Sequence, residues 1–472
     1  MKIYLLNPPF VKNFVRSSRC TWIPIAGSSW PPIFLAYATG LLEKNGHKAK
    51  LVDGTVGDWN LDKILNDVKE FEPDITVVYI SLDSLESDVK VAKSIKEKAK
   101  TKIVFVGPWC AIEPEKMMEK YPVIDILIRR EFEWPLHQIC QDQNIKDIGW
   151  LVWRNESGQI VTNQDGGFMN TEQLDSLPFA ADVYRRHLNI KDYKQSSLAY
   201  PFVDTLTSRG CAWGKCTFCL WPQTIHKDAM FRMRSIESVI EELKFIKNEM
   251  PDIKEVFFQD DMLPPGRLKD IAQAIIDNNI KMEWSGYAKT NLTYDILKLA
   301  KKSGCRFLHV GYETGDQQIL NNVDKGEIVE KMEEFTKDAK NAGVKIHGDF
   351  IFGLPGETKE TIQKTIAWAK KLNISDYQFV VPQPHPATCM YKELDGKGLL
   401  TEDGKPNYPH LTIDQLEHWR FEAYKKIYLN PKYVVTHVLG SWNDKAEFAR
   451  LFKVAWRGFP KLVKALVKFR KA

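Results

Sequence analysis

The chain has 472 residues, of which 44% are hydrophobic and 27% are charged. These values are close to the soluble globular average, so they exclude the disordered, collagen-like and disulfide-scaffold classes of protein. No run approaches the roughly 18–20 apolar residues that a membrane-spanning helix needs. The start, MKIYLLNPPF, lacks the charged stretch, long apolar run and cleavage site of a secretory signal. A cytoplasmic location is therefore expected.

The net charge of +5 comes from the end of the chain. Residues 441–472 hold nine Lys or Arg and two acidic residues, and the other 440 residues are close to neutral. Apolar residues such as Phe448, Phe452 and Trp456 recur at helical spacing, with basic residues on the opposite face. This pattern predicts a basic amphipathic helix, which either contacts an anionic membrane or packs on the rest of the protein. Nucleic acid is not an expected partner, because no RNA-binding module is visible.

Strand and helix patterns alternate over residues 1–145. The alternation predicts a doubly wound parallel sheet, and ligands of such sheets bind outside the carboxyl ends of the strands. Strands are expected at 2–9, 49–56, 74–82, 102–108 and 125–134, and helices at 31–46, 61–73, 87–99 and 113–122.

A second alternating region follows a linker at 146–197, in which 150–163 is expected to form a hairpin. Six strand–helix units favour a partial βα barrel over 198–395, with its active site at the carboxyl ends of the strands. Residues 396–472 are assigned to a C-terminal helical region. The barrel strands are expected at 202–208, 255–261, 281–289, 307–313, 345–353 and 377–383.

Three of the eight cysteines, Cys211, Cys216 and Cys219, lie in one loop after the first barrel strand. Soft thiolates in a loop suit either an iron–sulfur cluster or zinc. Zinc would need a fourth ligand such as His226, although the neighbouring Lys227 and Asp228 suggest that His226 lies on an exposed loop. The position at the top of a barrel favours a cluster with one open iron over a structural zinc site.

The cysteine loop resembles that of the radical S-adenosylmethionine (radical SAM) superfamily. The similarity continues at the strand ends, and segments before residue 180 resemble radical SAM proteins with an N-terminal cobalamin-binding domain. The barrel segments are 259–261, 311–315, 348–358 and 384–388, and the N-terminal segments are 30–53, 73–74, 128–133 and 174–179.

The resemblance implies a role for each matching residue. Cys211, Cys216 and Cys219 would hold a 4Fe-4S cluster. SAM would be bound by Phe218 and Gly353 near the adenine, by Gln259, Asp260 and Asp261 at the methionine amino group, by Lys289 near the carboxylate, and by Glu313 at the ribose. The resemblance also implies reductive cleavage of SAM to a 5′-deoxyadenosyl radical, with a flavodoxin or ferredoxin as reductant. The division that follows is a cobalamin-binding-like domain at 1–145, the linker, and a radical SAM barrel at 198–395.

The chain departs from the family pattern in two places. Four residues separate Cys211 from Cys216, where the family has three, and Gly214 can absorb the extra residue because glycine tolerates unusual backbone angles. The Asp-x-His-x-x-Gly segment that supplies a histidine to cobalt is absent. Many related radical SAM proteins also lack that histidine and bind cobalamin without it.

Three functions stay open at this point. The first is cobalamin-dependent methylation of an unactivated carbon on an apolar or lipid-like substrate. The second is a radical SAM cyclase or rearrangement enzyme without methyl transfer. The third is a zinc- or cluster-stabilised binding protein without turnover. Two further histidines, His309 and His347, lie on expected strands and are interpreted as interior residues with hydrogen-bond partners.

Overall fold

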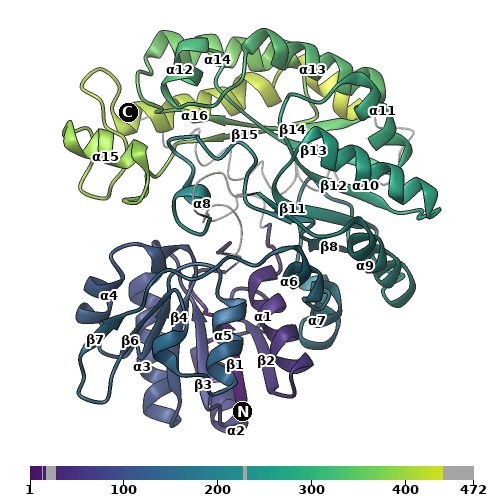
Figure 1. Ribbon diagram of the computed structural model, residues 1–472. Helices are drawn as coiled ribbons and strands as arrows, with labels where there is room; N and C mark the ends of the chain where they lie inside the picture. Colours follow the sequence, from purple (N-terminus) through teal and green to yellow (C-terminus); the bar gives the residue numbers. More distant parts are fainter. Residues whose placement is uncertain (13, 17–27, 227–230, 440–472) are drawn as a thin grey trace. The chain divides into compact units, whose positions relative to one another are not determined.

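The computed structural model describes residues 1–12, 14–16, 28–226 and 231–439 (Figure 1). The chain divides into two compact units. The first unit contains residues 1–195, 199–211 and 220–261, and the second contains 196–198, 212–219 and the residues from 262 onward. The predicted helix in the tail, 441–472, lies outside the described residues. In the described part of the chain, no helix is long and apolar enough to cross a membrane.

The first unit contains a seven-stranded sheet with the order β2-β1-β3-β4-β5-β6-β7. The first five strands are parallel, as predicted, while β6 and β7 are antiparallel. The hairpin expected in the linker is therefore present, and it extends this sheet. The strands are β1 (Lys2–Asn7), β2 (Lys48–Asp53), β3 (Ile75–Tyr79), β4 (Lys102–Val106), β5 (Ile126–Ile128), β6 (Leu151–Arg154) and β7 (Ile160–Thr162).

Helices cover this sheet because each presents an apolar stripe to it. Ile64 and Val68 of α2 and Ile95 of α3 are completely buried in the same core as Tyr4 and Leu6 of β1. Burying each such side chain contributes about 1.5–3 kcal/mol. The helices up to residue 195 are α1 (Ile33–Lys44), α2 (Leu61–Phe71), α3 (Leu85–Lys98), α4 (Pro114–Lys120), α5 (Glu133–Cys140), α6 (Thr171–Ser176) and α7 (Ala180–His187), with the short 3-10 helices η1 (Pro108–Ala111), η2 (Ile145–Asp147) and η3 (Ile190–Asp192).

The second sheet has six strands in the order β15-β14-β13-β12-β11-β8, and all six were predicted. They are β8 (Phe202–Thr205), β11 (Glu255–Leu263), β12 (Glu283–Ala288), β13 (Cys305–Glu313), β14 (Lys345–Ile351) and β15 (Asp376–Val380). A short antiparallel pair, β9 (Ser208–Arg209) with β10 (Arg232–Met233), was not predicted. Two-residue strands carry too little apolar pattern to be recognised in a sequence.

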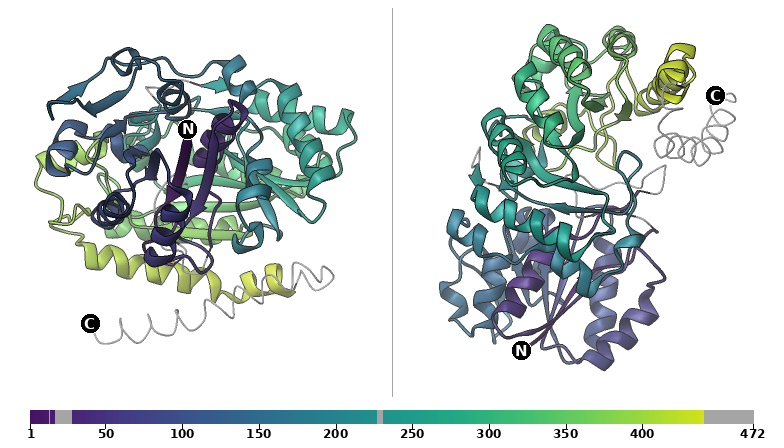
Figure 2. Two further views of the ribbon diagram at one scale, coloured as in Figure 1. Left: turned by 90° about the horizontal axis from the view of Figure 1, so that it is seen from below. Right: turned by 90° about the vertical axis from the view of Figure 1, so that its right-hand side faces the viewer.

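The edge strand β15 is covered by a C-terminal helix. In Figure 2, α16 (yellow-green) runs beside β15, and the backbone N–H groups of Tyr377 and Phe379 donate to the hydroxyls of Tyr428 and Tyr424, each at 3.1 Å. These hydrogen bonds satisfy backbone donors at a sheet edge that would otherwise be open. The remaining helices are α8 (Leu220–Gln223), α9 (Ile236–Glu249), α10 (Pro265–Asp277), α11 (Tyr294–Lys302), α12 (Gln317–Asn322), α13 (Val329–Ala342), α14 (Lys359–Leu372), α15 (Cys389–Gly396), α16 (Ile413–Tyr428) and α17 (Pro431–Tyr433), followed by the π-helix η4 (Val434–Leu439).

A buried ion pair ties together the strand ends of the first sheet. Arg16 Nη2 lies 2.8 Å from Asp88 Oδ1, and neither side chain is exposed. Arg16 also donates to Asn7 Oδ1, at the end of β1, at 2.8 Å and to Ser84 Oγ, just before α3, at 3.1 Å. One guanidinium therefore bridges the segments that follow β1 and β3.

Removing one member of this pair leaves the other charge buried. We expect Asp88→Ala to lower the free energy of unfolding by about 3–5 kcal/mol. The double variant Arg16→Met with Asp88→Leu should recover most of that loss, because no charge is then buried. Chemical denaturation followed by circular dichroism measures both values. A double variant as unstable as Asp88→Ala would contradict this account.

Candidate functional site

In the first unit, the predicted residues Gln259, Asp260 and Asp261 lie in the second half of β11. Asp260 is fully buried and accepts hydrogen bonds from the backbone N–H and hydroxyl of Thr207, at 3.1 and 2.9 Å, and from the hydroxyl of Ser208. Its carboxylate therefore holds the segment that leads to Cys211. Gln259 is also buried, and its Oε1 accepts no hydrogen bond from the described residues. An acceptor left in this state fits a ligand with N–H donors, such as the ammonium group of SAM.

His226 is not on an exposed loop, so that expectation was wrong. Only 3% of the residue is exposed, because its ring stacks on buried Trp221 at a centroid distance of 6.2 Å. Burial lowers the pKa of His226, which favours the neutral ring. Lys227 and Asp228 suggested exposure, but a polar neighbour in sequence does not determine where a side chain packs.

The described residues contain no group of three His, Cys, Asp or Glu side chains placed to hold one metal ion. Cys211 belongs to the first unit, whereas Cys216 and Cys219 belong to the second. None of the three forms a disulfide with a described residue, and all three are partly exposed. Three soft sulfur donors in one loop fit an iron–sulfur cluster by their chemistry.

In the second unit, the cysteine loop docks on the turn 323–326. The N–H of Thr217 donates to the carbonyl of Val323 at 3.1 Å, and Trp213 Nε1 donates to the carbonyl of Asp324 at 2.7 Å. Gly214 has φ +64°, the left-handed angle that was predicted to absorb the longer spacing. These contacts fix the position of the cysteine loop, and we call the turn 323–326 its seat.

Lys289 completes this seat. Its Nζ lies 4.4 Å from the centre of the Trp213 ring and donates to the carbonyl of Lys325 at 3.1 Å. A cation over an indole face is favourable. Lys289 is thus in contact with Trp213 of the cysteine loop.

Glu313 forms a buried ion pair with a residue that the sequence did not reveal. Lys325 Nζ lies 2.6 Å from Glu313 Oε1, and Gly311 provides the space, since a Cβ there would meet both side chains. Although burial opposes its charge, Glu313, Glu327 and Cys216 together raise the pKa of Lys325, so it is a cation near a predicted cluster ligand. Lys325 lies in none of the motif segments that resemble the superfamily, and only the fold brings it to Glu313.

The backbone of Glu313 has φ +61°, an uncommon angle for a residue with a side chain. Gly353 has φ +105°, and a Cβ there would meet Leu416. Its N–H donates to Glu357 Oε2 at 2.6 Å and its carbonyl accepts from Tyr408 at 3.0 Å. The backbone at Gly353 is thus held in a conformation that only glycine adopts easily.

The predicted adenine contact Phe218 is half-buried in the cysteine loop.

His309 and His347 are interior residues with partners, as predicted. Their rings stack at a centroid distance of 4.4 Å. His347 lies 2.8 Å from Asp376 and 3.2 Å from Asp349, while His309 Nε2 lies 3.1 Å from Ser197 Oγ. Both rings are therefore satisfied by protein groups.

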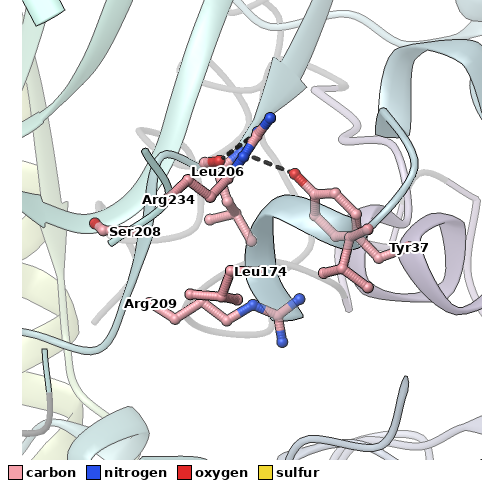
Figure 3. A pocket seen from close by; sticks show the side chains of 7 residues that line it. Tyr37, Leu174, Leu206, Ser208, Arg209 and Arg234 are labelled. Atoms are coloured by element: carbon pink, nitrogen blue, oxygen red, sulfur yellow. Dashed lines mark hydrogen bonds between the residues drawn. The ribbon is translucent and has the colours of Figure 1, made fainter. Parts of the chain in front are cut away.

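A small pocket in the first unit is no substrate site. Figure 3 shows Arg234 and Tyr37 bonded to the backbone of Leu206, with Arg234 donating to its carbonyl at 2.9 Å. The cavity of about 10 Å³ has room for roughly one water. It is lined by Tyr37, Leu174, Leu177, Leu206, Ser208, Arg209 and Arg234.

The carboxyl ends of the first sheet carry amide and hydroxyl groups. None of the histidines between residues 1 and 195 follows a strand of this sheet. Asn7 donates to Asp53 at 2.8 Å, and Ser81 and Ser84 share a hydrogen bond of 2.7 Å. Gly107, after β4, has φ +119°, and a Cβ there would meet the carbonyl of Ile80. This donor set fits the amide-rich rim of a corrin and offers no imidazole to cobalt.

Two family models match the chain: "Radical SAM superfamily" over residues 205–369 and "B12 binding domain" over residues 25–139. The chain belongs to the radical SAM superfamily and carries an N-terminal B12-binding domain. It is a radical SAM enzyme, and its cofactors are a 4Fe-4S cluster, SAM and cobalamin.

Known proteins are similar over nearly the whole chain. An uncharacterized methyltransferase of Pyrococcus horikoshii is 29% identical, covering 93% of this chain and 95% of its own. The cytidylyl-2-hydroxyethylphosphonate methyltransferase of Streptomyces wedmorensis is 24% identical, covering 84% and 82%. The solved structure of TsrM from Kitasatospora setae, a radical SAM methyltransferase with cobalamin and a [4Fe-4S] cluster bound, has a TM-score of 0.71 at 15% identity, covering 97% and 98%. At that identity the structure supports the fold alone.

The seat of the cysteine loop can be tested at Gly326. Its φ is +66°, and a Cβ would overlap the Trp213 ring. We expect Gly326→Ala to reduce the iron bound after anaerobic reconstitution by more than half, while the protein stays folded. Gly398→Ala is the matched control, because Gly398 has φ +65° but nothing within 4 Å of its Cβ position. Equal iron in both variants would show that cluster assembly does not depend on the contact between Trp213 and Gly326.

Proposed function

We propose that this enzyme transfers a methyl group to an unactivated carbon of an apolar or lipid-like small molecule. The observation that carries the proposal is the presence of a B12-binding domain and a radical SAM domain in one chain. The near full-length similarity to two methyltransferases supports methyl transfer over ring closure or rearrangement. The basic tail of 441–472 is the reason for the apolar substrate class.

The cofactors supply reductive cleavage of SAM to a 5′-deoxyadenosyl radical and a methyl group carried on cobalt, and the protein supplies position and exclusion of water. In this proposal Cys211, Cys216 and Cys219 hold the cluster. A flavodoxin or ferredoxin supplies the electron. Lys325, close to Cys216, offsets negative charge at the cysteine loop.

In this proposal each polar residue of the site binds one group of SAM. Gln259 and Asp261 receive the ammonium group, and Lys289 faces the carboxylate. Glu313, fixed by Lys325, accepts hydrogen bonds from the ribose hydroxyls. Phe218 and Gly353 border the adenine. Asp260 acts indirectly, since its oxygens already accept hydrogen bonds from Thr207 and Ser208.

The decisive experiment uses SAM with a deuterated methyl group. Enzyme purified with cobalamin and reconstituted anaerobically is incubated with reductant, labelled SAM and a small-molecule extract of the source cells. We expect 5′-deoxyadenosine, S-adenosylhomocysteine and an extract compound that has gained the labelled methyl group. Mass spectrometry detects all three. Cys216→Ala should abolish all three products. The control Cys140→Ala, at the end of helix α5 in the first unit, should not.

The alternative gives a different result. 5′-Deoxyadenosine without transfer of label would indicate a cyclase or rearrangement enzyme.

We also propose that the enzyme works in the cytoplasm and contacts the membrane peripherally through 441–472. Deleting these residues should abolish cosedimentation with vesicles that contain phosphatidylglycerol, because the positive surplus of the chain is lost with them. The full chain should bind pure phosphatidylcholine vesicles weakly. Equal binding of the truncated and full chains to the anionic vesicles would exclude the tail as the contact.

A further inference from the structure

A buried group of charged side chains lies in the first unit beside Asp261. It consists of Glu131, Glu133, Arg209, His226, Arg232 and Asp261, and we call it the charge cluster. Five of the residues are buried, and the Arg232 side chain is 11% exposed. Charges so far from water persist only when they face partners.

Two arginines bind the loop after β5 to the short strands β9 and β10. Both terminal nitrogens of Arg232 donate hydrogen bonds to the Glu131 carboxylate, at 2.6 and 2.9 Å. Arg209 Nη2 lies 2.6 Å from Glu133 and Nη1 lies 3.6 Å from Glu131. The two-pronged contact with Glu131 fixes the direction of the Arg232 guanidinium as well as its place.

His226 stands between this ion pair and Asp261. Arg232 Nη2 lies 3.3 Å from His226 Nδ1, and His226 Nε2 lies 3.4 Å from Asp261 Oδ2. A guanidinium can only donate, so Nδ1 accepts and the neutral ring carries its proton on Nε2. The polar edge of the ring thus lies within ion-pair distance of the Asp261 carboxylate, in a geometry that is not a hydrogen bond. The second carboxylate near the ring, Glu131, is 3.7 Å from Nδ1 and is already held by Arg232.

We propose that His226 is a positioning residue that orients the Asp261 carboxylate toward the ammonium group of SAM. The ion pairs of Glu131 and Glu133 keep His226 in place. Three carboxylates then face two guanidinium groups, so the charge cluster carries one formal negative charge, which suits a cationic ligand at its Asp261 end. The inference rests on the proposed role of Asp261 and extends it to a residue outside the motif segments on which the resemblance was based.

The test compares His226→Leu, which loses both polar contacts, with His226→Gln, whose amide keeps one acceptor and one donor. His47→Gln, at a partly exposed histidine near the start of β2, is the control. Iron content is measured first. SAM is then titrated into the reduced protein, and its binding is followed through the electron paramagnetic resonance spectrum of the cluster.

We expect equal iron in all variants, because His226 holds no metal. The SAM concentration at the midpoint should rise about tenfold in His226→Leu, because a buried carboxylate loses the polar group beside it, and less than about threefold in His226→Gln. If His226→Leu does not fold, His226→Asn takes its place, since its shorter amide reaches only one of the two partners. An unchanged midpoint in the folded variant, or iron loss in both His226 variants, would overturn the proposal.

Failure of the proposed function has a separate signature. A wild-type spectrum that does not respond to SAM would refute SAM binding at the cluster, whatever the variants do. An unchanged midpoint in Asp261→Asn, with a responsive wild type, would refute the role of Asp261. A raised midpoint in Asp261→Asn with no effect of His226→Leu would refute His226 alone.

Discussion

Compensation of buried charge is the constraint on which this structure depends. An ionised group loses several kcal/mol of hydration when it is buried, so it persists only beside an opposite charge or several hydrogen bonds. Arg16 with Asp88, Arg232 with Glu131, Arg209 with Glu133 and Lys325 with Glu313 all meet this condition. Each pair joins segments that are far apart in sequence or lie on different elements. The charges that make the site polar therefore also hold its loops in place.

The cysteine loop illustrates how a changed motif length is accommodated. The additional residue between Cys211 and Cys216 does not leave a loose loop in the second unit. Gly214 takes a left-handed angle, and Trp213 donates to Asp324 while it packs over Gly326. Trp213, which lies in the lengthened part of the loop, thus supplies the contacts that hold the loop in place. A loop held by such contacts loses less conformational freedom when a cluster binds.

Most of the fold was predictable because its strands are long apolar runs with clear ends. All six strands of the second sheet and the five parallel strands of the first were expected. The pair β9–β10 was missed because two-residue strands have no periodicity. The joining of β6 to β5 was missed because pairing between hairpin and sheet depends on contacts that a local pattern does not record.

The candidate site divides in the same way. Motif residues such as Gln259, Glu313 and Gly353 could be named because their segments resemble those of the radical SAM superfamily. His226 was placed on an exposed loop, and Lys325 was not named, because their importance comes from neighbours in space. Asp260 and Asp261 are adjacent in sequence, yet one holds Thr207 and the other faces His226.

The sequence by itself determined the family, the cofactors and the order of the elements, because each depends on residue type and spacing along the chain. Only the tertiary structure decided which charges are buried together, which of two adjacent carboxylates lies beside His226, and how the longer cysteine loop is seated. Those outcomes depend on distance and on exclusion of water, and folding alone sets both.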